Sequence, residues 1–410
     1  MASLRRWALL FTAALAISGC SATDDRVSVA APESGEEPYV SQSLGGDDDR
    51  SSGFRDPMTG LLIVPTSFHA LPGWRSDDLS GVVDAMRRSC SAIQASGDTR
   101  RLGSVRIDAT EWRRLCGQLL RIRPEQARGY LETNFAPVRI GPASRGLMTA
   151  YFEPVLEARR RPDQRFRYPI YAPPPELKRQ GGAYGVATGA GLRPHFSRGE
   201  IDAGALQGRR LEIAWLNDPI DLFFLHIQGS GSLRFADGST TRVGFAGKNG
   251  HAYRSVGREM IARGWARGGD ASPEAIRALY RANPGRGREL LAFNKSYIFF
   301  REIRDLDPGS GPVGALGAQL TAGRSIAVDR DFAPLGAPVW IDAPASPIGP
   351  IRRLAVAQDT GSAIKGAQRI DLFMGSGARA GEIAGGFSHP VRVTVLLPKT
   401  TLARMRANAN

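Results

Sequence analysis

Two aspartates inside apolar, strand-like runs constrain the fold of this chain most strongly. Residues 354–375 read LAVAQDTGSAIKGAQRIDLFMG and place Asp359 and Asp371 on either side of a turn made of small residues. Residues 354–357 and 370–374 are short apolar runs near glycine, which predicts two buried strands. A carboxylate in such a run is unfavourable unless it is hydrogen-bonded, paired with a cation or kept partly protonated.

Turn chemistry accounts for Asp359 better than for Asp371. Asp359 opens an Asp-Thr-Gly turn, in which backbone N–H groups can bind the carboxylate. No turn signal follows Asp371 until Gly375, so the same explanation is weaker there. Further apolar runs lie at residues 325–329, 338–341 and 391–397, and turns with glycine and proline separate them. The set predicts a compact β-barrel at the C-terminal end.

The N-terminal part of the chain predicts helices. Residues 79–93 carry apolar side chains at helical spacing, and Asp108 or Thr110 can cap a second helix. Pro124 opens a third helix.

The central part predicts strands mixed with further helices. Asp237-Gly238 predicts a hairpin turn. Asn249 is a candidate N-cap of a helix that ends near Gly264, and Ser272-Pro273 starts another helix. Strand-like runs occupy residues 146–153, 211–215, 220–228, 240–245 and 294–300.

Residues 1–20 read as a secretion signal that ends in a lipobox. Arg5 and Arg6 precede an apolar run at residues 7–17, which is too short to span a bilayer. The sequence Ile17-Ser18-Gly19-Cys20 predicts lipidation of Cys20, and the following serine favours the outer membrane, facing the periplasm. An ordinary signal, cleaved after a small residue, is the alternative. Residues 21–58 are poor in large apolar side chains and predict a flexible linker.

The remaining cysteines and the histidines limit the chemistry. Cys90 and Cys116 lie on helical stretches of a chain with a secretion signal, where a disulfide is plausible, but their separation in space cannot be read from the sequence. The 5 histidines are scattered and show no metal-ligand spacing. The sequence therefore predicts neither a metal nor a cofactor.

The aspartate motifs resemble those of a known family. Asp359 begins D-T-G-x-A-I-K-G, Asp371 lies in R-I-D-L-F-M-G, and Asp329 lies upstream in GRSIAVDRDFAPLGAPVWI. The central part adds I-Q-G-S-G and F-A-G-K-N-G-H-A-Y. These motifs are similar to those of the membrane-bound lytic murein transglycosylase A family, which has a C-terminal three-aspartate domain, and the resemblance covers about residues 60–399.

The resemblance implies a mainly β fold of two domains with a groove between them. A double-psi β-barrel domain with N-terminal helices would combine residues 59–153 with residues 312–402. A second, β-rich domain of residues 154–311 would be inserted between these segments and would hold one wall of the substrate groove.

The activity implied by the resemblance is that of a peptidoglycan lytic exotransglycosylase, although the sequence does not distinguish chain ends from chain middles. Such an enzyme cleaves the MurNAc–GlcNAc β-1,4 bond without water, because the MurNAc C6 hydroxyl attacks C1 and forms a 1,6-anhydro ring. By motif, Asp371 is the catalytic residue, and Asp359 and Asp329 are supporting residues. Motif position predicts these substrate-binding residues, each with a turn or capping role as the alternative: Thr149, Tyr151, Gln228, Ser230, Lys248, Asn249 and Tyr253.

The residue chemistry is compatible with one catalytic carboxyl group. It can protonate the leaving oxygen and then, as a carboxylate, take the C6 proton, whereas most sugar hydrolases need two carboxyl groups. A raised pKa suits this acid, and Ile370, Leu372 and Phe373 could provide the apolar surroundings. Arg369 conflicts with this prediction, because on the same strand face it would favour the carboxylate. The conflict disappears if Arg369 points to solvent or to the substrate.

The implied partners are peptidoglycan glycan strands, the outer membrane through the lipid anchor, and a cell-wall synthesis or division complex. The net charge of +14 and the pI of about 10.3 agree with anionic lipid headgroups and peptidoglycan carboxylates, and we expect no nucleic acid. Two alternatives remain open. One is a glycan hydrolase on the same barrel, with Asp359 as the nearby second carboxylate, and the other is a non-catalytic glycan-binding lipoprotein.

Overall fold

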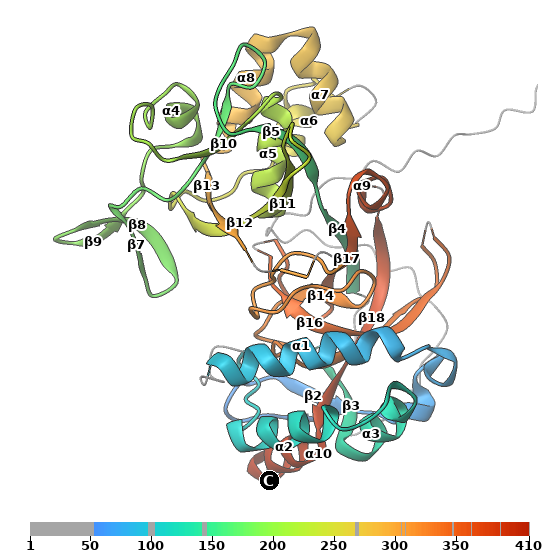
Figure 1. The fold of residues 1–410 in the computed structure, drawn as a ribbon. Coiled ribbons are helices and arrows are strands. Elements are labelled where there is room, and N and C mark those ends of the chain that lie inside the picture. Colours follow the sequence, from blue (N-terminus) through green and yellow to red (C-terminus); the bar gives the residue numbers. More distant parts are fainter. Residues whose placement is uncertain are drawn as a thin grey trace, which may run out of the picture.

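The computed structural model describes residues 53–96, 103–141, 146–266, 270–304, 306–307, 309–346, 348–361, 363–385 and 387–409. The predicted signal, Cys20 and the linker up to residue 52 lie outside the described residues. Figure 1 shows two parts, one around a nine-stranded sheet with helices packed on it and the other around a six-stranded sheet. None of the helices in the described ranges is long and apolar enough to cross a membrane.

The nine-stranded sheet combines strands from both ends of the chain. Its order is β1 (Phe54–Arg55), β2 (Leu62–Pro65), β3 (Phe135–Ile140), β18 (Ser388–Pro398), β15 (Pro338–Ala343), β16 (Ile351–Asp359), β14 (Ser325–Val328), β17 (Arg369–Ser376) and β4 (Gly146–Glu153). Strand β4 pairs with β18 as well as with β17, so the strands from β18 to β4 close into a ring of paired strands. Every C-terminal strand predicted from the sequence is present.

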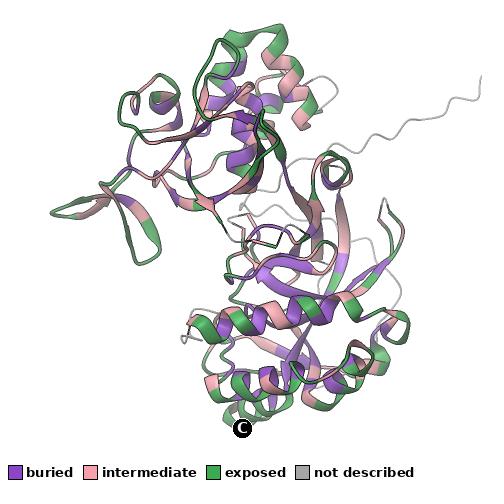
Figure 2. Cartoon of the chain, in the orientation of Figure 1, coloured by how far each residue is buried: buried purple, intermediate pink, exposed green. Residues whose placement is uncertain are grey.

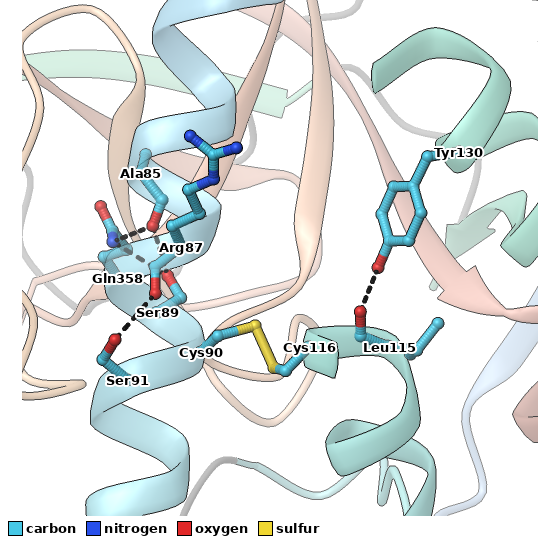
Figure 3. The surroundings of a disulfide bond; sticks show 9 residues. All are labelled: Ala85, Arg87, Ser89, Cys90, Ser91, Leu115, Cys116, Tyr130 and Gln358. Carbon is cyan, nitrogen blue, oxygen red and sulfur yellow. Dashed lines mark hydrogen bonds between the residues drawn. A yellow bond between two sulfur atoms is a disulfide. The ribbon is translucent and has the colours of Figure 1, made fainter. Parts of the chain in front are cut away.

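Helices pack against this sheet. They are α1 (Ser80–Ser96), α2 (Ala109–Leu119), α3 (Ala127–Asn134), α9 (Ala378–Gly385) and α10 (Lys399–Ala409). Asp108 is the N-cap of α2, and Pro124 begins a short 3-10 turn that leads into α3. The predicted apolar face of α1 is buried, as the alternating purple and green of that helix in Figure 2 shows. A disulfide joins Cys90 of α1 to Cys116 of α2 and confirms the pairing that the sequence left open (Figure 3).

The second part contains the central residues of the chain. Its six-stranded sheet has the order β13 (Ile298–Ile303), β12 (Thr240–Lys248), β11 (Ser230–Arg234), β5 (Val155–Arg159), β10 (Glu212–Leu216) and β6 (Tyr168–Tyr171). A small sheet adds β7 (Leu177–Gln180), β8 (Ala183–Thr188) and β9 (Gly191–Arg193). The helices are α4 (Arg198–Asp202), α5 (Pro219–Gln228), α6 (Val256–Ala262), α7 (Pro273–Ala282) and α8 (Pro284–Phe293). The predicted hairpin turn at Asp237-Gly238 joins β11 to β12, with Gly238 at φ 81°.

Two predictions in this part are wrong. Residues 220–228, predicted as a strand, form helix α5, because the Asp218 side chain accepts a hydrogen bond from Ile220 N and Pro219 occupies the first turn. The apolar run has no clear period because much of the helix is buried. Asn249 does not cap a helix, since α6 begins only at Val256, after the N-cap Ser255.

Arg242 of β12 connects the two parts of the molecule. Its Nε lies 3.1 Å from Oε1 of Glu153, which ends β4 and is fully buried. Its other guanidinium nitrogens donate to backbone oxygens of Ser310 (2.6 Å) and Asp307 (3.3 Å), in the segment that leads back to the first sheet. One side chain therefore holds both chain crossings between the two parts.

Candidate active site

The strand register places Asp371 beside Thr149. Strands β17 and β4 are parallel, with Asp371 opposite Thr149 and Phe373 opposite Tyr151. Ile370 and the other apolar neighbours of Asp371 on β17 are buried, whereas Asp371 itself remains partly exposed. The carboxyl group therefore has apolar surroundings and access to solvent.

Asp371 has one direct hydrogen-bond donor among the described residues. The Thr149 hydroxyl donates to Oδ1 of Asp371 at 2.6 Å, and Nη2 of Arg369 donates to the same hydroxyl oxygen at 2.9 Å. Burial raises the pKa of Asp371 to about 6, although the Thr149 hydrogen bond and the charge of Arg369 lower it, and the carboxylate of Asp359 raises it further. A carboxyl group with this pKa can give up and regain a proton near neutral pH.

Asp359 is bound by several donors. Its Oδ1 accepts from the backbone N–H groups of Ala315 and Thr360, each at 2.9 Å, and its Oδ2 accepts from the Tyr151 hydroxyl at 2.9 Å. Burial raises the pKa of Asp359, although these hydrogen bonds lower it. The predicted turn chemistry explains one of these contacts, that of Thr360. The neighbouring Gln358 fixes the end of β16 by donating to Ala85 O and Ser89 Oγ of α1, each at 2.9 Å (Figure 3).

Asp329 joins two turns. It follows β14 directly, and its Oδ2 accepts from Gly366 N at 2.9 Å. Its Oδ1 accepts from Asp331 N at 3.2 Å and lies 4.0 Å from Lys365 Nζ. These contacts are those of a structural residue that ties the turn after β14 to the turn before β17.

Two predicted substrate residues in the second part lie close to the end of β4. Gln228 ends α5 and Ser230 begins β11, and both side chains are partly exposed. Ser232 N donates to Pro154 O at 2.8 Å, which places the start of β11 beside the end of β4. The Oε1 atom of Gln228 is buried without a hydrogen-bond partner in the described part of the chain.

The other three predicted residues lie at the end of β12 or beyond it. Lys248 ends that strand four residues beyond Gly244, the partner of Ser230, which corresponds to about 13 Å of extended chain. Lys248 and Tyr253 are partly exposed. Asn249 is fully buried, and its amide donates to Phe196 O and Lys295 O, each at 2.8 Å. Tyr297 N donates to Oδ1 of Asn249 at 2.9 Å. The amide group of Asn249 therefore hydrogen-bonds to backbone groups through both its nitrogen and its oxygen.

Sequence reasoning left one charged residue near the site undecided and missed two. Arg369 does act on Asp371 as strand alternation predicted, because its charge lowers the pKa of that carboxyl group. The alternative, in which Arg369 points to solvent or to the substrate, is wrong, since its side chain is buried and bound to Thr149. Glu153 and Arg242 were missed, and the signal for Glu153 was a carboxylate between an apolar strand and Pro154. Within the described ranges, no cluster of three or more His, Cys, Asp or Glu residues could hold a metal ion.

Two family models match the chain. The MltA specific insert domain matches residues 147–301, and the 3D domain matches residues 324–397. Membrane-bound lytic murein transglycosylase A of Escherichia coli (strain K12) is 36% identical over 314 residues, which are 74% of this chain and 73% of that protein. The protein of that name from Vibrio cholerae is 36% identical over 256 residues, 60% of this chain and 64% of that protein.

Solved structures agree with these matches. A membrane-bound lytic murein transglycosylase from Agrobacterium tumefaciens has a TM-score of 0.75 at 39% identity, covering 84% of this chain and 99% of that chain. Escherichia coli MltA with bound chitohexaose has a TM-score of 0.59 at 28% identity, covering 86% of this chain and 99% of that chain.

Proposed function

The chain belongs to the membrane-bound lytic murein transglycosylase A family, and on this premise we propose that Asp371 is its single catalytic residue. The protein is a peptidoglycan lytic transglycosylase, an enzyme of cell-wall turnover and remodelling. Its substrate is the glycan strand, and the bond it cleaves joins MurNAc C1 to the O4 atom of GlcNAc.

In the proposed reaction, protonated Asp371 gives its proton to the GlcNAc O4 atom while the C1–O4 bond breaks. The MurNAc C6 hydroxyl then bonds to C1, and the Asp371 carboxylate takes the proton that this hydroxyl loses. The product ends in 1,6-anhydroMurNAc, and Asp371 returns to its protonated form. Because the attacking hydroxyl belongs to the substrate, positioning replaces the second reactant that a hydrolase needs.

The difference between the two carboxyl groups carries this proposal. Both carboxyl groups are partly exposed and burial raises the pKa of each, that of Asp371 to about 6, but Asp371 has one described donor, on Oδ1. Both oxygens of Asp359 already accept hydrogen bonds, from Ala315 and Thr360 on one side and Tyr151 on the other. Asp359 is therefore suited to hold the site together, and Asp371 is suited to exchange a proton.

We further propose the finer fold that the family implies. Residues 59–153 and 312–402 would form a double-psi β-barrel domain, and residues 154–311 an inserted domain, with the glycan groove between them. The closed ring of strands and the joining of both ends of the chain in one sheet support this proposal. Of the predicted substrate residues, Asn249 is left out, because backbone contacts occupy its amide; the groove residues proposed are Thr149, Tyr151, Gln228, Ser230, Lys248 and Tyr253.

The lipobox supports a proposed location at the outer membrane, facing the periplasm, with Cys20 as the lipidated residue. The linker of residues 21–58 would let the enzyme reach glycan strands away from the membrane. A cell-wall synthesis or division complex is the kind of assembly in which such an anchored enzyme would work.

Mass spectrometry of fragments released from purified peptidoglycan tests the reaction. The protein used is the soluble form that lacks residues 1–20. We expect products ending in 1,6-anhydroMurNAc, lighter by one water than the corresponding reducing-end products. Reducing-end products would instead indicate a hydrolase, and binding without release would indicate a glycan-binding protein.

A further inference from the structure

Arg369 is buried beside the site and acts only as a donor. Its side chain is fixed by three acceptors, with Nη1 donating to Ile370 O at 2.5 Å and to Leu147 O at 3.3 Å. The third acceptor is the Thr149 hydroxyl, to which Nη2 donates at 2.9 Å. A guanidinium group has N–H donors and no acceptor, so the direction of this last hydrogen bond is unambiguous.

The direction of that bond determines where the Thr149 proton lies. A threonine hydroxyl has one proton, and its rotation is normally free to suit the surroundings. Because Arg369 donates to the oxygen of Thr149, the proton of Thr149 is left for the neighbouring acceptor, Oδ1 of Asp371, at 2.6 Å. An acid proton on Oδ1 would point at the proton of Thr149. In the described part of the chain no donor reaches Oδ2.

We propose that Arg369 is a positioning residue that acts through Thr149: it orients the hydroxyl so that the acid proton of Asp371 is held on Oδ2. This inference rests on the proposed catalytic role of Asp371. The proton for the leaving oxygen would then come from one defined atom, and the same atom would be free to accept the C6 proton afterwards. General acid–base catalysis depends on such placement of the proton.

The charge of Arg369 adds a measurable consequence. Arg369 lowers the pKa of Asp371, and Asp359 on β16 raises it. At the level of Asp371 lie Thr149 of β4, Ala327 of β14, and Ser388 with the adjacent His389 of β18. Tyr151 of β4 lies two residues farther along, opposite Phe373. Helix α9 packs on β4 and β17 and carries Arg379 and Glu382, both exposed to solvent. Arg379→Gln is therefore a matched control for the loss of one positive charge.

The experiment compares Arg369→Gln, Arg369→Lys and Arg379→Gln in release of anhydro products from peptidoglycan over a range of pH. We expect Arg369→Gln to lower kcat by about tenfold or more, with little change in KM, because general acid catalysis contributes about 10²–10⁴-fold. The alkaline limb of the profile should move to higher pH by about one unit, since a nearby cation that lowered the pKa is gone. Arg369→Lys should restore the position of the limb and part of kcat, and Arg379→Gln should change neither.

A second pair of variants tests whether Arg369 acts through the hydroxyl. Thr149→Val removes the hydroxyl, and Thr149→Ser should recover most of what Thr149→Val loses. In the Thr149→Val background, Arg369→Gln should lower kcat by less than twofold, because its effect would already be absent. Equal losses in both backgrounds, or an alkaline limb that stays in place in Arg369→Gln, would overturn the inference.

If Arg369→Gln does not fold, the Thr149 variants still test the inference. In that case Thr149→Val must itself lower kcat by about tenfold or more, and an unchanged kcat would overturn the inference. Failure of the proposed function would look different, because wild-type protein would then release reducing-end products, or Asp371→Asn would retain activity.

Discussion

Asp371 and Asp359 both pair with Ala327, from opposite sides of β14. Ala327 is opposite Asp371 in the antiparallel pairing with β17 and opposite Asp359 in the parallel pairing with β16. One strand therefore separates the two carboxyl groups, and they lie at the same level of the ring. Their different partners, and not their positions along the ring, distinguish the proposed catalytic residue from its neighbour.

Asp371→Asn should abolish the release of anhydro products while the fold is kept. The amide can still accept from Thr149 but cannot give a proton to the leaving oxygen, so a loss of at least about 100-fold is expected. Product release by mass spectrometry and circular dichroism measure the two effects. Asp329→Asn is the control, because the contacts of Asp329 with other described residues are with turn groups and Lys365. Residual activity above a few per cent in folded Asp371→Asn would exclude Asp371 as the catalytic acid.

The activity of the wild-type enzyme should fall as the pH rises above about 6. The acid must be protonated to act, and burial places the pKa of Asp371 at about 6. Asp359→Asn should move this limb to lower pH, because the charge that raises the pKa of Asp371 is removed. It should lower kcat by only about tenfold, unlike Asp371→Asn. If both variants were equally inactive, a two-carboxylate mechanism would fit better.

Asp371→Asn should also stabilise the protein at neutral pH. The folded pKa of about 6 lies above the ordinary value of 3.8, so folded protein loses stability as the pH rises from about 4 through 6. A shift of about two units corresponds to at most about 3 kcal/mol. The melting temperature of Asp371→Asn should therefore exceed that of wild type at pH 7.5, and the two should converge near pH 4. A constant difference across this range would contradict the raised pKa.

The disulfide between α1 and α2 should contribute to stability and not to the reaction. It closes a loop with a sequence separation of 26 residues, which corresponds to about 3.5 kcal/mol in the chain-entropy model. The Cys90→Ala, Cys116→Ala double variant should lose about this amount in urea unfolding, and its kcat at 25 °C should match that of wild type. Thiol alkylation before and after reduction should detect no free thiol at either position in the oxidised protein.

The sequence predicted the strands around Asp371 because their apolar runs are short and bounded by turn residues. It failed at α5, where an apolar helix without a clear period resembled a strand, although Asp218 and Pro219 were a visible helix start. The role of Asn249 could not be predicted, because its partners Phe196 and Lys295 lie far away in the sequence.

The sequence left the direction of the Arg369 side chain open for the same reason, because its partner lies far away in the sequence. Strand alternation correctly placed Arg369 near Asp371, but only the parallel pairing with β4 shows that Thr149 lies between the two charged groups. Long-range strand pairing determines this contact, and no local pattern in either segment reports it.

Arg242→Met should destabilise the protein more at pH 8 than at pH 5. It leaves Glu153 fully buried without its cation, and breaking such a pair costs about 3–5 kcal/mol. Burial raises the pKa of Glu153, so the folded protein loses stability as the pH rises and the carboxyl group must ionise. Adding Glu153→Gln should recover part of the loss in urea unfolding, but not the contacts of Arg242 with Ser310 and Asp307. Arg234→Met, which removes an exposed arginine of the same sheet, is the control. Equal stability of Arg242→Met and Arg234→Met at pH 8 would show that the Arg242–Glu153 pair does not hold the two parts of the molecule together.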